Sequence, residues 1–424
     1  MPTIMNYRHL SFIAIFALVV SVLFSVTVCR AETENVSPET IQIPQNLATL
    51  QETFQDASSL DQGKLVILIQ DLHSSVQVQE NIAELIHYFV EDYELNLVAY
   101  EGNEGFVETD KVFSVTDPKL TNKVAKKLLE QLRLSGAEYA HVTTQKKFQL
   151  WGMEDTSIYE QNINRFRKAI YLKQDAGNFI RDLNSGLIKT LQSIASEEGK
   201  KLVKLILSYR TKQITLNEYY FELIKSAREK NIDITDLTNF FNLTQTKDEN
   251  QKINHKQFKE ELNKAEDRLT QAMLTETNAL EIYQALERLT VLASMVSLSS
   301  TRDQWNQYQN NRELFKQEQF TRLIDDDYQS NSYVTSFQST LDELVEAATQ
   351  FYETAQVRDG IISQNVLKIL EKEEKVILVS GGFHVEGITQ ILEEKGISYL
   401  VVTPLYSQHQ ALEQKNYMEK LLTV

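Results

Sequence analysis

The chain has 424 residues, 42% of them hydrophobic, and a formal net charge of −16. Such an excess of carboxylates repels phosphate backbones, so we do not expect nucleic acid as a partner. The only cysteine, Cys29, lies in the N-terminal apolar segment, so a mature chain without that segment would contain no disulfide. Exported proteins without cysteine are typical of the bacterial envelope rather than of small disulfide-rich extracellular domains.

The first 31 residues have the layout of a secretory signal peptide. Arg8 precedes an apolar segment at 10–28, and Ala31 stands at a suitable cleavage position. We therefore expect an exported protein, periplasmic or secreted, with no membrane span after cleavage. Two alternatives stay open. One is an uncleaved anchor, because the apolar segment is almost long enough to span a bilayer; the other is lipidation of Cys29.

An α/β pattern begins after a polar stretch. Residues 32–60 contain Pro38 and Pro44 and predict a linker, with one short helix near 47–54. From residue 61, short apolar runs alternate with helical stretches. We expect strands at 64–70, 96–100 and 147–151, and a helix at 75–91. These elements make residues 61–155 the first half of an α/β core.

The middle of the chain is predicted to be entirely helical. Between Lys200 and Asp359 there is no glycine or proline, the two strongest breakers of regular structure. We therefore expect an all-helical insertion at 156–355 that serves as a lid over the sheet. The second half of the core, 356–424, then follows. Its expected elements are a helix at 357–372, a strand at 375–380, a helix at 385–395 and a strand at 397–402.

One short pattern occurs twice, at the ends of two predicted strands. The strand at 64–70 runs into Gln-Asp-Leu-His, ending at His73, and the strand at 375–380 runs into Gly-Gly-Phe-His, ending at His384. Both runs are apolar and rich in β-branched residues, as in parallel strands buried on both faces. The carboxyl ends of parallel strands share one edge of the sheet, where such sheets bind ligands. We therefore expect the two histidines to meet there.

Charged residues are expected at the same edge. Glu101 ends an apolar strand, where an unpaired carboxylate is costly; Glu154 follows the strand at 147–151, and Arg358 opens the helix at 357–372. Imidazole and carboxylate groups bind zinc, manganese and iron. They also suit a histidine base that activates water, with an arginine that stabilises the oxyanion. For Glu154 and Arg358, a helix cap or a structural ion pair is the alternative.

The position of the histidines predicts their protonation. Both stand at or just before the first turn of a helix, where the helix dipole disfavours imidazolium. We therefore expect neutral imidazoles, as a general base or a metal ligand requires. Gly381 and Gly382 would allow backbone amides to approach a cofactor or ligand closely.

These motifs resemble the superfamily of ChaN-like haem-binding lipoproteins, TraB proteins, Tiki proteases and erythromycin esterases. The shared pattern is a strand with Gly-x-x-His near each end of the chain, a glutamate ending the next strand and a long helical middle. The second motif matches, whereas Gln70 replaces the glycine of the first. The resemblance covers about 61–155 and 356–404. It implies His73, Glu101 and His384 as catalytic or ligand residues, with Arg358 as their partner.

The superfamily leaves the chemistry open. Tiki-like members are described as metal-dependent proteases, erythromycin esterases hydrolyse a lactone ester with a histidine base, and ChaN-like members bind haem. We predict an exported hydrolase of a peptide or small-molecule ester, in which His73, Glu101 and His384 hold the attacking water. If a metal is used, we expect manganese, zinc or cobalt, bound by these residues and Glu154. The alternatives are a haem-binding envelope protein without turnover and a scaffold that has lost its activity, as the departure at Gln70 suggests. A homodimer is compatible with the sequence.

Overall fold

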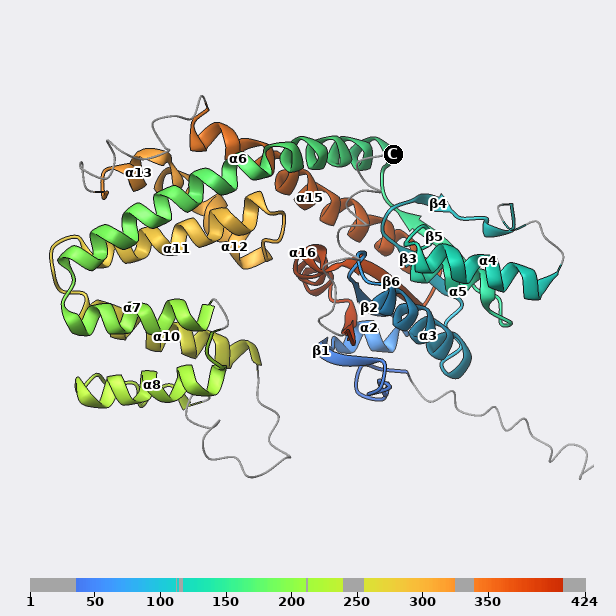
Figure 1. Ribbon diagram of the computed structural model, residues 1–424. Helices are drawn as coiled ribbons and strands as arrows, with labels where there is room; N and C mark the ends of the chain where they lie inside the picture. Colours follow the sequence, from blue (N-terminus) through green and yellow to red (C-terminus); the bar gives the residue numbers. More distant parts are fainter. Residues whose placement is uncertain are drawn as a thin grey trace, which may run out of the picture. The chain divides into compact units, whose positions relative to one another are not determined.

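The computed structural model describes residues 36–111, 113, 117–210, 213–238, 255–324 and 339–406. They form two compact units (Figure 1): one contains the described residues up to Thr156 and from Arg358 onward, and the other is Ser157–Val357. These boundaries lie within a few residues of those predicted for the insertion. The predicted signal peptide at 1–31 lies outside the described residues.

The described part of the first unit is built on a seven-stranded, mostly parallel sheet, which confirms the predicted α/β fold. The strand order is β1-β7-β2-β6-β3-β5-β4. The five inner strands are parallel, and the edge strands β1 and β4 are antiparallel to their neighbours. The strands are β1 Ala48–Phe54, β2 Leu65–Asp71, β3 Leu97–Tyr100, β4 Glu104–Phe106, β5 Gln149–Met153, β6 Lys375–Gly381 and β7 Ser398–Pro404.

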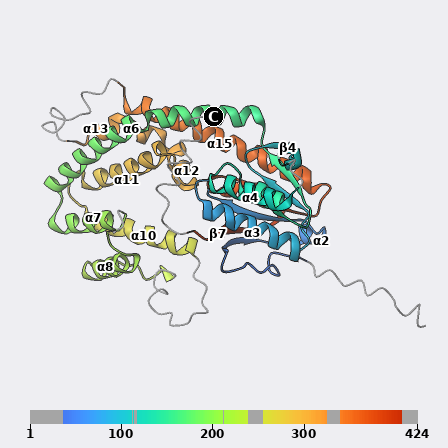
Figure 2. The ribbon, with the colours of Figure 1, turned by 45° about the vertical axis from the view of Figure 1, so that its right-hand side comes forward.

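The central strands are buried on both faces because helices cover each side of the sheet. Alternate residues of β2 enter opposite apolar layers: Ile67 packs with α3 (Val76–Asp92) and α5 (Gly136–Thr143), as Figure 2 shows for α3. Leu68 packs with α16 (Gly382–Glu394) and with the C-terminal part of α15 (Leu341–Leu370). This two-sided burial explains why β2, β6 and β7 are unbroken apolar runs rather than alternating patterns.

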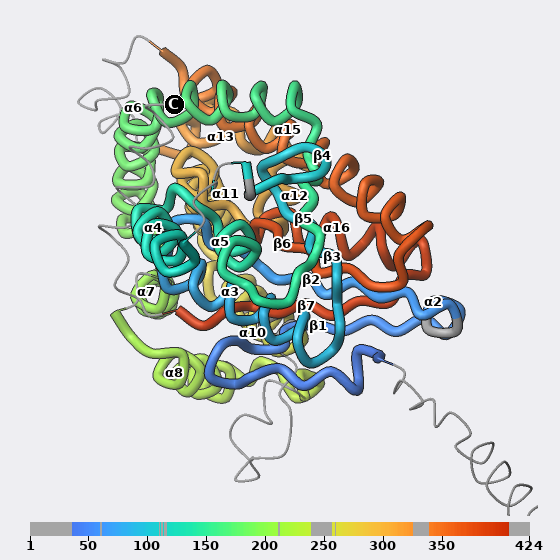
Figure 3. The backbone as a smooth tube through the Cα atoms, turned by 90° about the vertical axis from the view of Figure 1, so that its right-hand side faces the viewer, coloured from blue at the N-terminus to red at the C-terminus, as the bar shows by residue number. Residues whose placement is uncertain are grey.

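The prediction of a linker at 32–60 is wrong from residue 48 onward, and the short helix predicted near 47–54 is a strand. Residues 48–54 form β1, which pairs with β7 from Ala48 opposite Pro404 to Phe54 opposite Tyr399 (Figure 3). A short helix, α2 (Ala57–Asp61), follows. The side chains of β1 are mostly exposed, so the strand carries no apolar run or alternation. It exists because β7 supplies its backbone hydrogen bonds, and a sequence pattern does not record that partner.

The second unit is all-helical in its described residues, as predicted. Tyr283, Leu286 and Leu289 of α11 are buried, as their helical spacing indicates, and the capping box between Thr215 and Glu218 opens α8. The polar run at 243–252, whose composition predicts a loop between the helices, lies outside the described residues. The helices are α6 Thr156–Ile194, α7 Glu197–Arg210, α8 Leu216–Glu229, α10 His255–Met273, α11 Ala279–Val296, α12 Arg302–Asn310 and α13 Gln317–Thr321, followed by the first half of α15.

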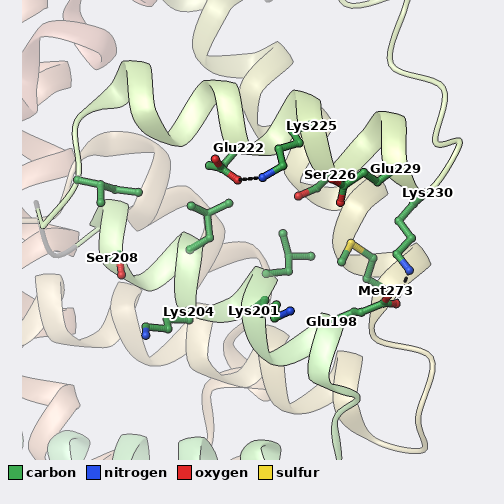
Figure 4. Close-up of a pocket in the computed structure, with 13 residues that line it drawn as sticks. Glu198, Lys201, Lys204, Ser208, Glu222, Lys225, Ser226, Glu229, Lys230 and Met273 are labelled. Carbon is green, nitrogen blue, oxygen red and sulfur yellow. Dashed lines mark hydrogen bonds and ion pairs between the residues drawn. The ribbon is translucent and has the colours of Figure 1, made fainter.

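A groove of about 650 Å³ lies between α7 and α8, with Met273 at one end (Figure 4). Its charged residues form solvated ion pairs, such as Lys225 with Glu222 at 3.3 Å and Lys230 with Glu198. No histidine is among the described residues that line this groove. Histidine is the side chain that titrates near neutral pH without perturbation, so the sheet edge, with its two histidines, is the better candidate for acid–base chemistry.

None of the helices that the structure describes is both long and apolar enough to cross a membrane.

The close approach of the segment after β3 to β5 depends on Gly152. A Cβ at this position would lie 2.1 Å from the carbonyl carbon of Asn103. We expect Gly152→Ala to lower the free energy of unfolding by about 1–3 kcal/mol, the usual cost of overpacking, as a lower urea midpoint. The control is Gly360→Ala within α15, where an added Cβ meets nothing within 4 Å. Because alanine has the higher helix propensity, this substitution should stabilise the helix by up to about 1 kcal/mol. Equal midpoints for the two variants would contradict this account.

Candidate active site

The register of the sheet brings the two histidine motifs together. In the β2–β6 pair, Asp71 lies opposite Gly381. His73 follows the end of β2, and His384 lies in the first turn of α16, directly after β6. Glu101 directly follows the neighbouring strand β3. Its backbone N–H donates a hydrogen bond to the carbonyl oxygen of Val379 in β6. The predicted convergence of His73, His384 and Glu101 on one sheet edge therefore matches their positions in the fold.

Arg358 reaches the same edge by a route different from the predicted one. The helix that carries it does not begin at 357; α15 begins at Leu341 and runs without interruption to Leu370. Arg358 and Asp359 therefore lie in its middle, where both are buried. The sequence from 341 to 359 contains no glycine or proline, so the start of this helix was predicted too late.

Glu101 is the centre of the cluster. Its Oε1 accepts a hydrogen bond from Nη2 of Arg358 at 2.7 Å and lies 3.5 Å from Nε2 of His384 and 3.9 Å from Nε2 of His73. Its Oε2 accepts from the backbone N–H of Gly381 at 2.7 Å and from the hydroxyl of Ser380 at 3.1 Å. Burial raises the pKa of Glu101, but His384 and Arg358 outweigh it and hold that pKa well below its usual range. Glu101 is therefore ionised.

His384 is cationic, which corrects the predicted neutral imidazole. Burial lowers its pKa, but the negative charge of Glu101 and the hydrogen bond to Asp359 outweigh burial and raise the pKa to about 9. The Nδ1 atom lies 2.6 Å from Oδ1 of Asp359. A helix dipole contributes roughly 0.3–1 kcal/mol at an exposed site, which is less than two buried carboxylates contribute at hydrogen-bonding distance.

His73 is the solvent-facing member of the cluster. Its side chain is 37% exposed, whereas that of Asp71, to which its Nδ1 is bonded at 2.5 Å, is 4% exposed. In the neutral ring, a proton on Nδ1 that is donated to Asp71 leaves the lone pair on Nε2, which faces Glu101. Sequence reasoning assigned no role to Asp71 or Asp359. The available signal was one carboxylate two residues before His73 and another directly after Arg358.

Glu154 serves as the charge partner of Arg358. Its Oε2 accepts from Nε of Arg358 at 3.1 Å and its Oε1 accepts from Nη2, so both oxygens are occupied by the guanidinium. Its side chain is 1% exposed. The two carboxylates raise the pKa of Arg358 despite burial. Glu154 therefore forms the structural ion pair that was the alternative to a metal-ligand role, and disrupting such a buried pair costs about 3–5 kcal/mol.

The two glycines have different functions in this arrangement. A Cβ on Gly381 would lie 3.2 Å from Oε2 of Glu101, 3.6 Å from Nε2 of His73 and 3.8 Å from Cδ2 of His384. The absence of a side chain thus lets these three groups lie close to the backbone at the end of β6. A Cβ on Gly382 would instead lie 2.3 Å from Nε2 of Gln70. Gly382 accommodates Gln70, whose Oε1 accepts from Thr403 at 2.8 Å, at the position where the first motif departs from the superfamily pattern.

The arrangement fits a divalent metal poorly. The Nε2 atoms of His73 and His384 face one oxygen of Glu101, and carboxylates hold both Nδ1 atoms, as around many bound metals. However, that oxygen already accepts from Arg358, and His384 is protonated. Accordingly, no group of three or more His, Cys, Asp or Glu side chains in the described part of the chain has the spacing of a metal site. A metal would require both deprotonation of His384 and displacement of Arg358.

No protein-family model, curated protein or solved structure matches this chain.

The charge on His384 predicts how stability depends on pH. Because the folded-state pKa of about 9 lies above the ordinary value of 6.5, the stabilisation is complete below about pH 6.5 and is lost as the pH rises through 9. At about 1.4 kcal/mol per pKa unit it amounts to roughly 3 kcal/mol. We expect the urea midpoint of the wild type to fall between pH 6.5 and 9.5, and that of His384→Gln to fall much less. The control, His87→Gln, changes a histidine whose Nε2 contacts the Ala140 carbonyl oxygen at 3.2 Å. Parallel pH profiles for the wild type and His384→Gln would refute the assignment.

Proposed function

We propose that this sheet edge is a hydrolytic site for a peptide or ester bond, with His73 as the general base. The observation that carries the proposal is the environment of His73. It is an exposed imidazole whose Nδ1 is held by the buried Asp71 and whose Nε2 faces a buried charged cluster. Histidine is the side chain whose ordinary titration range spans neutral pH, which makes it the commonest general base in enzymes.

In the proposed reaction, the lone pair on Nε2 of His73 takes a proton from water as the water oxygen attacks the carbonyl carbon. The carbonyl π electrons move to its oxygen and form a tetrahedral oxyanion. When the oxyanion collapses, the bond to the leaving alcohol or amine breaks, and His73 returns the proton to that group. Asp71 keeps the ring oriented and stabilises the transient imidazolium, as a buried aspartate does in other histidine-dependent hydrolases.

In this proposal, the oxyanion shares with Glu101 the N–H groups of two buried cations. His384 and Arg358 are both held charged, and both contact Oε1 of Glu101. Because Asp359 and Glu154 fix their positions before substrate binds, these side chains need no reorganisation during the reaction.

Metal-dependent hydrolysis is the first alternative. His73, Glu101 and His384 would be the ligands, and manganese, zinc or cobalt would lower the pKa of a bound water. Metal analysis of the purified protein, with activity assays before and after chelation, separates this route from the metal-free one. Unchanged activity after complete metal removal supports the metal-free mechanism.

Haem binding without turnover is the second alternative, and the resemblance to ChaN-like proteins is its motive. His384 is buried, with both ring nitrogens within 3.5 Å of carboxylate oxygens. Nε2 of the more exposed His73 lies 3.9 Å from Glu101, so His73 is the better candidate axial ligand. A Soret shift on haem titration that disappears in His73→Ala would favour it. Export to the periplasm or medium remains part of the proposal and rests on residues 1–31.

The assay that tests the hydrolase is a screen of peptide and ester substrates on the full-length protein. We expect His73→Gln to lower kcat/KM by roughly 10²–10⁴-fold, because the general base is removed. The matched control is again His87→Gln, in a histidine of α3 bonded to a backbone carbonyl. If the wild type is active and His73→Gln retains that activity, His73 is not the base.

A second prediction concerns the space beside Gly381. This residue has φ −59° and ψ 147°, which alanine also adopts, so Gly381→Ala should fold normally. Its methyl group would contact Glu101, His73 and His384, with the closest approach 3.2 Å from Oε2 of Glu101. We expect kcat to fall at least about tenfold, while the urea midpoint changes by less than about 1 kcal/mol in free energy. Full activity in this variant would show that the water and the substrate do not use this space.

A further inference from the structure

A buried glutamine lies behind the histidine–aspartate pair. Asp71 uses Oδ2 for His73, and its Oδ1 accepts a hydrogen bond from Nε2 of Gln79 at 2.5 Å. Oε1 of Gln79 in turn accepts from the backbone N–H of Gly136 at 2.6 Å. Gln79 is 2% exposed. An unbroken chain of hydrogen bonds therefore links Gly136 to the ring of His73.

The direction of this chain is determined by its first donor. A backbone N–H can only donate, so the atom of Gln79 that faces Gly136 must be the oxygen. The nitrogen must then face Asp71, where it can only donate. Gln79 thereby fixes the position of the Asp71 carboxylate, whose other oxygen, Oδ2, lies 2.5 Å from Nδ1 of His73. Because a carboxylate can only accept, Nδ1 carries a proton. The lone pair of the neutral ring is confined to Nε2, the atom that faces Glu101.

The local fold explains how these groups meet. Ser75 caps α3 immediately after His73, which puts Gln79 in the first turns of that helix and near the end of β2. A capping box formed by Ser135 and Glu138 starts α5 at Gly136. A Cβ on Gly136 would lie 2.4 Å from the carbonyl oxygen of Gln79. Only glycine lets the N-terminus of α5, with its unsatisfied N–H groups, approach α3 this closely.

We propose that Gln79 is a positioning residue that sets the tautomer and orientation of His73 through Asp71. The inference rests on the proposed function only where it concerns the rate, because the tautomer of His73 is measurable without a substrate. An isolated buried amide would cost stability. Here both polar ends are used, and one of them serves the side chain that orients the base.

The test is Gln79→Met in the full-length protein, which keeps the size of the side chain and removes both hydrogen bonds. The control is Gln77→Met, at an exposed position of the same helix. With ¹⁵N-labelled histidine, the two ring nitrogens of His73 give separate resonances, assigned by their loss in His73→Gln. We expect the wild type and the control to show Nδ1–H only, and Gln79→Met to show a mixture of tautomers. With an active substrate, kcat should fall about 10–100-fold, as for other partners of a ligand or catalytic histidine.

A purely structural glutamine would change the urea midpoint but leave the tautomer and the pH profile of kcat unchanged, and that result overturns the inference. If Gln79→Met does not fold, Gln79→Leu takes its place. Leucine can neither accept from Gly136 nor donate to Asp71, so the same mixture is expected. If the tautomer changes but His73→Gln keeps full hydrolytic activity, the positioning role stands and the proposed function fails.

Discussion

The site depends on one buried carboxylate, Glu101, at the carboxyl end of a central strand. An ionised carboxylate with a side chain only 9% exposed is strongly unfavourable unless cations and hydrogen-bond donors surround it. Arg358 and His384 supply the charge, and Gly381 and Ser380 supply the donors. Each cation has a second carboxylate partner: Glu154 for Arg358 and Asp359 for His384. The solvent-facing His73 lies at the edge of this cluster, 3.9 Å from Glu101.

The cluster remains acidic even with its cations in place. Four carboxylates, those of Asp71, Glu101, Glu154 and Asp359, surround Arg358, His384 and His73. With His73 neutral, the negative charges exceed the positive ones. This excess favours the cationic form of His384, whose pKa is raised. Two histidines in similar motifs thus acquire different chemistry, because one is exposed and the other is buried between carboxylates.

The departure of the first motif from the superfamily pattern is matched within the structure. Gln70 replaces the expected glycine, and its side chain occupies the space that a side chain at position 382 would take. Gln70 and Gly382 are therefore a large and a small residue that fit together beside the ends of β2 and β6. His73 and Asp71 keep their contacts in spite of this exchange, so Gln70 by itself gives no reason to expect a lost site.

The sequence by itself determined the sheet, the helical insertion and the edge at which the chemistry-bearing residues gather. Unbroken apolar runs and the absence of helix breakers are local properties of the sequence. The alternating order of strands and helices then places the carboxyl ends of the parallel strands at one edge. Only the tertiary structure decided the strand β1, the charge on His384, and the partners Asp71, Asp359 and Gln79. The exposed strand depends on the hydrogen bonds of β7, and the charge depends on distances between segments as far apart as Glu101 and Arg358, which are separated by 257 residues. Such energies arise from ångström-scale distances between remote groups, and no local pattern of residues encodes them.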